Sequence, residues 1–99
     1  MFQTTKYCSM EIAINHLSES DYHKLGISDW PIWEKEISVF EWNYEETEQF
    51  YLIEGLVQIK TEQGNFDIKP GDFVECSKGL HCKWEIKEYV KKHYHFIDE

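Results

Sequence analysis

Residues 50–86 read FYLIEGLVQIKTEQGNFDIKPGDFVECSKGLHCKWEI, and this stretch decides the fold. Apolar and polar residues alternate along much of it, as in Phe66-Asp67-Ile68-Lys69. Alternation with period two is typical of strands that turn one face to a core and the other to water. Glycine-containing turn signals interrupt the pattern at 63–65, 70–72 and 77–79. The stretch therefore predicts several short strands joined by tight turns.

The first part of this stretch, residues 50–61, is expected to form two strands that meet near Glu54-Gly55. The apolar residues of one parity are assigned to a single face, and these are Tyr51, Ile53, Val57 and Ile59. Period two also extends beyond it, to the aromatic residues Phe40, Trp42 and Tyr44 before it and to residues 92–96 after it. Many short strands of this kind indicate an all-β sandwich or barrel. The alternative, an α+β domain, needs a second amphipathic helix that the sequence does not show.

The N-terminal part of the chain carries the one helix signal. Ser18 is a candidate N-cap, Asp21 lies three residues on, and Gly26 is a candidate C-terminal stop. Residues 12–14 are a plausible extra strand that can pair with a second subunit. We expect one domain overall, with residues 1–29 as a strand and helix extension and residues 30–99 as the barrel.

Composition excludes several function classes. The chain has 99 residues, a formal charge of −9 and no arginine, so phosphate backbones and anionic membranes are poor partners. The only basic cluster is a short one, Lys87 with Lys91 and Lys92. No apolar run approaches the ~20 residues that span a bilayer, and the N-terminus does not resemble a signal peptide. We expect a cytoplasmic protein with no nucleic-acid or membrane partner.

The three cysteines, Cys8, Cys76 and Cys82, are an odd number without a CxxC pair. Free thiols in a reducing compartment are the expectation. Cys76 and Cys82 flank a short turn, so a disulfide across a hairpin is the minor alternative.

The spacing of several residues in this region resembles the cupin pattern. Glu48 stands before Gly55 as in the E-x6-G end of the first cupin motif, and residues 71–82 fit the second motif, G-x5-P-x-G-x2-H, in spacing. Further matching pieces lie at 30–36, 78–84 and 91–94. Together they resemble small single-domain cupins related to the ureidoglycine aminohydrolase cupin domain, in the RmlC-like superfamily. This resemblance implies a double-stranded β-helix, or jelly-roll barrel, and a homodimer; many such relatives have no assigned reaction.

The resemblance also gives the positions at which cupins bind a metal, and here they hold Trp42, Tyr44, Glu48 and Cys82. Indole offers no lone pair to a metal, tyrosine is an uncommon ligand, and cysteine suits zinc or copper(I). Only Glu48 is an ordinary ligand. We therefore expect no metal and no cofactor.

The same positions predict a binding pocket inside the barrel. Strand parity and the resemblance place five side chains there: Trp42, Tyr44, Glu48, Cys82 and Trp84. Aromatic faces and polar tips can hold a small organic ligand. The competing interpretation is that large rings simply fill a small barrel.

Two of these residues have sharper alternatives. Glu48 on an aromatic-lined face is a candidate general acid or base, against a rim carboxylate in water or one tied to a Lys or Tyr side chain. Cys82 is a candidate nucleophile, but adjacent His81 faces the opposite side of the strand, so a small buried thiol is the better interpretation.

His93 and His95 form an H-x-H pair that can chelate a metal, although no third ligand is placed by spacing. Tyr94 and Phe96 are expected to face the core and to leave both histidines outward. The sequence thus favours a small cupin that binds a small organic molecule in an aromatic-lined pocket. The alternative is an enzyme that acts on a small nitrogenous or carbonyl compound with Glu48 as general acid or base.

Overall fold

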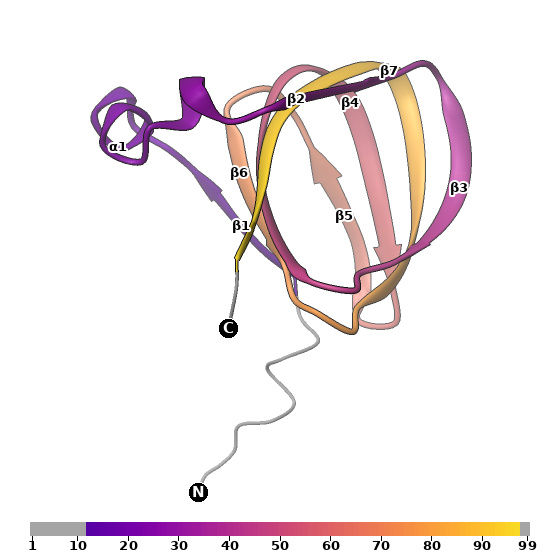
Figure 1. The fold of residues 1–99 in the computed structure, drawn as a ribbon. Helices are drawn as coiled ribbons and strands as arrows, with labels where there is room; N and C mark the ends of the chain where they lie inside the picture. Colours follow the sequence, from indigo (N-terminus) through magenta and orange to yellow (C-terminus); the bar gives the residue numbers. More distant parts are fainter. Residues whose placement is uncertain (1–11, 98–99) are drawn as a thin grey trace, which may run out of the picture.

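The computed structural model describes residues 12–97, and it confirms an all-β barrel with one short α-helix (Figure 1). Residues 1–11, with Cys8, and residues 98–99 lie outside the described part. In chain order the elements are β1 (Ile12–His16), α1 (Glu19–Lys24), the 3₁₀ turn η2 (Ile27–Asp29), β2 (Ile32–Lys35), β3 (Ser38–Asn43), β4 (Thr47–Thr61), β5 (Gly64–Ile68), β6 (Asp72–Cys76) and β7 (His81–Ile97). No helix in the described residues is long and apolar enough to cross a bilayer.

Two long strands, β4 and β7, pair along almost their whole length and belong to both halves of the barrel. At one end of this ladder, β6 pairs with the start of β4 and β2 pairs with the second half of β7, at residues 90–93. At the other end, β5 pairs with the end of β4 and β3 pairs with the start of β7. All these pairs are antiparallel. The chain closes into a barrel because β4 and β7 curve together from one half to the other (Figure 1).

The curve lies at a bulge in β4, where the register with β7 shifts three times between Leu52 and Val57. An extra residue in one strand bends it and moves the following side chains to the other face. Phe50 and Leu52 face inward before the bulge, and Val57 and Ile59 face inward after it. Residues 50–61 therefore form part of one bent strand rather than two strands. The assignment of Tyr51 and Ile53 to the face of Val57 and Ile59 was wrong for the same reason.

Gly55 makes the bend sterically feasible. Its φ of 104° is a backbone conformation that side-chain-bearing residues rarely adopt. A Cβ atom there would lie 2.2 Å from the carbonyl oxygen of Tyr89 on β7. The two long strands can approach each other at this point only because position 55 lacks a side chain.

The N-terminal segment follows the sequence-based expectation locally. Ser18 caps α1, and its Oγ accepts a hydrogen bond from the Asp21 backbone N–H at 3.1 Å. Gly26 takes a left-handed conformation just past the helix end. The extra strand also exists, as β1, but one of its edges is taken by β6 of the same chain. Residues 12–16 are thus part of the sheet, while α1 lies outside the barrel (Figure 1).

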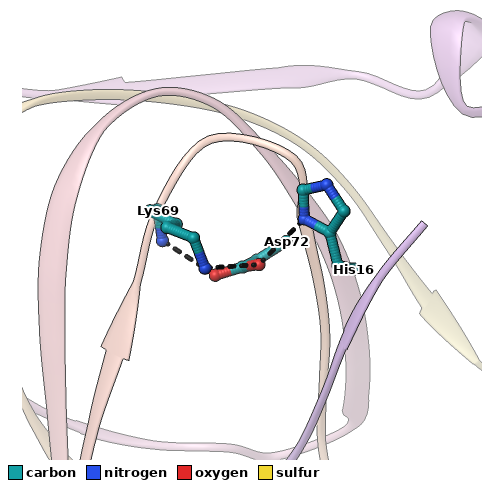
Figure 2. Close-up of polar contacts among 3 residues, drawn as sticks. All are labelled: His16, Lys69 and Asp72. Carbon is teal, nitrogen blue, oxygen red and sulfur yellow. Dashed lines mark hydrogen bonds and ion pairs between the residues drawn. The ribbon is translucent and has the colours of Figure 1, made fainter. Parts of the chain in front are cut away.

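A buried carboxylate holds the turn between β5 and β6 (Figure 2). Asp72 accepts a hydrogen bond from the Lys69 backbone N–H at 2.9 Å, and its other oxygen lies 3.6 Å from the Lys69 ammonium. The His16 ring, at the end of β1, approaches the same oxygen at 3.5 Å. One side chain therefore connects the Pro-Gly-Asp turn to the N-terminal strand.

We expect Gly55→Ala to lower the free energy of unfolding by about 2–5 kcal/mol, from backbone strain and the clash with Tyr89. Urea denaturation measures this. Gly64→Ala is the matched control, because Gly64 also has a positive φ but a Cβ there meets nothing within 4 Å. Equal losses in the two variants would contradict the close approach of β4 and β7.

Candidate functional site

One cavity of about 470 Å³ lies inside the barrel, lined by side chains from β2, β3, β4 and β7 and from the loop after β3. Aromatic rings make up most of its wall: Trp33, Phe40, Trp42, Tyr44, Trp84, Tyr94 and Phe96. Trp42 and Phe96 are half exposed, which places them where the cavity meets solvent. A second hollow of about 400 Å³ shares these two residues and adds the carboxylates of Glu45 and Glu46. The mouth of the cavity is therefore acidic as well as aromatic.

A buried ion pair forms the charged part of the wall. The Lys92 Nζ lies 2.7 Å from the Glu48 Oε2, and each side chain is only 7% exposed. β7 supplies Lys92 and the start of β4 supplies Glu48, which is the side chain expected there from the sequence. Glu48 is thus a buried carboxylate tied to a lysine, not a rim carboxylate in water.

Aromatic rings surround the ammonium of Lys92. Its Nζ lies 4.3 Å from the ring centroid of Phe50, 4.8 Å from those of Trp33 and Trp84, and 5.9 Å from that of Tyr94. Ring faces attract a cation at such distances, but they replace the water that solvates it. Burial lowers the pKa of Lys92, and the nearby Glu48 carboxylate opposes that shift.

Tyr44 is held in the cavity wall by its neighbours. Its hydroxyl accepts a hydrogen bond from the Trp84 indole N–H at 3.3 Å. Burial is the main reason that the pKa of Tyr44 lies well above its usual value of 10.0. Tyr44 therefore stays protonated and presents a fixed phenol to the cavity.

Cys82 is buried opposite Trp42 on the neighbouring strand, but it is not among the residues that line the cavity. Burial raises the pKa of Cys82 to about 11 and that of Cys76 to about 12. Both thiols are free. A nucleophile needs the thiolate, so these values favour small buried thiols over a catalytic role.

The two thiols give a pH dependence. The folded state keeps protons that the unfolded state releases above about pH 9, because the folded pKa values are about 11 and about 12. The stability this contributes is present in full below pH 9 and is lost as the pH rises through those values. We expect the free energy of unfolding of Cys82→Ala to fall less steeply between pH 9 and 11 than that of the wild type. Identical slopes in urea denaturation would contradict the buried, protonated thiol.

The histidine pair, His93 and His95, lies on the face of β7 that points away from the cavity, and the two rings do not form a chelate. The His93 Nδ1 lies 2.9 Å from the Trp30 carbonyl oxygen, while the His95 Nε2 lies 2.8 Å from the Gln49 Oε1. The His95 ring also stacks on the Trp30 indole, with centroids 3.8 Å apart. Both rings lie on this outward face of β7, as expected, but His93 is buried because the Trp30 segment covers this face. Tyr94 and Phe96 face the cavity, as expected.

The residues at the cupin metal positions do not fit a metal ion. The Glu48 carboxylate is already paired with the Lys92 ammonium, and the positive charge of that ammonium would repel a metal cation. The Tyr44 hydroxyl is engaged by Trp84, and the Trp42 indole has no lone pair to offer. In the described chain, no group of three or more His, Cys, Asp or Glu side chains is arranged to hold a metal. The absence of metal from the purified protein stays a prediction.

The site contains residues that the sequence analysis did not select. Lys92 was read only as part of a basic cluster, and Trp33 was not assigned to the pocket. Lys92 has the same parity as Trp84, Ile86 and Val90, which all face inward on β7. A lysine between two apolar residues of the same parity, Val90 and Tyr94, was the signal that could have identified it.

Comparison with known proteins supports the cupin assignment. Residues 22–94 match the family described as the EutQ-like cupin domain. This chain belongs to the EutQ-like cupin domain family. No curated protein matches the chain.

Solved structures agree with membership of this cupin family. A DUF861 family protein from Thermotoga maritima is 41% identical, with a TM-score of 0.85 over 88% of this chain and 100% of its own. A protein of unknown function of the DUF861 family from Pseudomonas syringae is 31% identical over 64% of this chain and 28% of its own, with a TM-score of 0.59. The EutQ protein of Clostridium difficile shares the fold, with 21% identity, a TM-score of 0.59, and coverage of 64% of this chain and 50% of its own.

Proposed function

We propose that this cupin binds a small organic molecule in the aromatic-lined cavity of the barrel. The observation that carries the proposal is the cavity itself, with a volume of about 470 Å³ and a buried ion pair among its aromatic walls. Small-molecule sites are typically concave and mostly apolar, with a few fixed polar groups. A barrel interior that was merely filled by large rings would leave no such space.

The walls favour a planar ligand without negative charge. Stacked rings present flat apolar faces, as do Phe40 and Trp84, whose ring centroids lie 5.9 Å apart. The Lys92 ammonium and the Tyr44 phenol supply the polar contacts. Glu41, Glu45 and Glu46 surround the mouth, so an anion would be repelled as it approached.

The second candidate function is an enzyme that acts on a small nitrogenous or carbonyl compound with Glu48 as general acid or base. The observation that favours it is the direct hydrogen bond between Glu48 and Lys92 in the cavity wall, along which a proton can move. The resemblance to the ureidoglycine aminohydrolase cupin domain points to nitrogenous substrates for the same site. A cytoplasmic location and a homodimer, for which the second edge of β1 offers a surface, belong to this proposal as predictions.

We expect thermal-shift screening of small planar neutral amides and aromatic compounds to yield ligands, because binding to the folded state alone raises stability. Trp42→Ala should lower the affinity for each ligand by up to about tenfold, because an aromatic contact is lost. Tyr89→Ala is the matched control, since Tyr89 is a half-exposed ring outside the cavity. Ligands that keep their full shift in both Trp42→Ala and Tyr44→Ala would place the binding site elsewhere.

Glu48→Gln applied to the same ligands separates the two functions. If the cavity only binds, affinity should change by about one hydrogen bond, ~0.5–1.5 kcal/mol. If a ligand is turned over, the rate should fall by roughly 10²–10⁴ with binding largely kept, because the positioned acid or base is gone.

A further inference from the structure

Lys92 has an environment unlike that of an ordinary lysine. Among the residues that the structure describes, it is the one lysine that is buried. Its Nζ lies between the rings of Phe50, Trp33 and Trp84, within 5 Å of the centroid of each ring. The one charged group bonded to it is Glu48. An apolar cavity that desolvates a primary amine favours its nucleophilic form, and a carboxylate in contact with that amine can accept and return its protons.

We propose that Lys92 is a nucleophile that forms an imine with a small neutral aldehyde or ketone, and that Glu48 moves the protons. This inference rests on the proposed function, because it needs the cavity to admit a small molecule. It makes carbonyl compounds the ligand class and gives each member of the ion pair a separate role.

The contact between Lys92 and Glu48 gives the ammonium proton a direct route to the carboxylate when a carbonyl compound is bound. Water is the best solvent for an ammonium and a carboxylate, and the rings around Nζ exclude it. The 2.7 Å hydrogen bond allows the proton to pass directly from Nζ to Oε2. The product is a neutral amine next to a neutral carboxylic acid, a pair that an apolar wall tolerates better than two separated charges.

The covalent step balances with these two side chains alone. The nitrogen lone pair attacks the carbonyl carbon, and the carbonyl π pair moves to oxygen. Glu48 gives its proton to that oxygen and takes one from the nitrogen, which leaves a neutral carbinolamine. Glu48 then protonates the hydroxyl, the C–O bond breaks, water leaves, and the nitrogen pair forms the C=N bond. An iminium cation then stands next to the Glu48 carboxylate.

Charge conservation makes this product compatible with the site. The reaction begins with one positive and one negative buried group and ends with the same two charges in contact. Neither charge is left without its partner, which would be strongly unfavourable in a buried site. The acidic mouth selects neutral carbonyl compounds over keto acids, because the carboxylate of a keto acid would meet Glu41, Glu45 and Glu46.

The test is reductive trapping with benzaldehyde and sodium cyanoborohydride near pH 7, followed by peptide mass spectrometry. We expect Lys92 to gain one benzyl group roughly tenfold faster than Lys35, which lines the same cavity without being buried. Lys92→Arg keeps a positive charge next to Glu48 but cannot form an imine, so the fast benzyl labelling should disappear in this variant. Lys35→Arg should keep the fast labelling of Lys92.

Equal labelling of Lys92 and Lys35 in the wild type would overturn the inference, and this comparison does not depend on how the variants fold. Benzyl alcohol, which cannot form an imine, separates the inference from the proposed function. Thermal stabilisation by benzyl alcohol without fast labelling of Lys92 refutes the nucleophile and leaves the binding cavity standing. If benzyl alcohol gives no stabilisation and Lys92 shows no fast labelling, both the nucleophile and the binding cavity are refuted.

Discussion

The contact between Lys92 and Glu48 is the constraint on which the interior of this cupin depends. Two opposite charges lie 2.7 Å apart, each almost fully removed from water. Desolvating either one alone would cost several kcal/mol, so each is tolerated only because the other is present. The long ladder between β4 and β7 brings them together. Leu52 lies opposite Lys92 and Glu48 opposite Phe96, so the lysine side chain extends diagonally past Phe50 to reach the carboxylate.

This internal cation explains how the barrel departs from a metal-binding cupin. Glu48 occupies the one metal-ligand position whose residue type is ordinary, and its carboxylate faces an ammonium instead. Tyr44 and Trp84 hydrogen-bond each other rather than an ion. Three of the four side chains at the metal positions, Trp42, Tyr44 and Glu48, instead line an aromatic cavity with one charged pair. Such a cavity suits binding and proton-transfer chemistry that a lysine and a glutamate can support.

Much of the fold could be predicted from local patterns, because turns and strand alternation depend on near neighbours. The Ser18 cap, the Pro-Gly-Asp turn and the inward direction of Cys82, Trp84 and Ile86 all follow from such rules. The bulge in β4 could not be predicted this way. It depends on the contact between Gly55 and Tyr89, which are far apart in the chain, and it moves Tyr51 and Ile53 to the opposite face from Val57. The burial of Lys92 and of His93 could not be predicted for a related reason: what covers them, the aromatic cluster and the Trp30 segment, comes from other strands and loops.

The most direct test of this account is a double-mutant cycle on the ion pair. Urea unfolding of Lys92→Met, Glu48→Gln and the double variant gives the coupling energy between the two side chains. We predict that each single change lowers the free energy of unfolding by roughly 3–5 kcal/mol, because it leaves a buried charge without its partner. The double variant should lose clearly less than the sum. Single losses below about 1 kcal/mol that simply add, as for an exposed pair, would contradict the buried ion pair at the centre of this barrel.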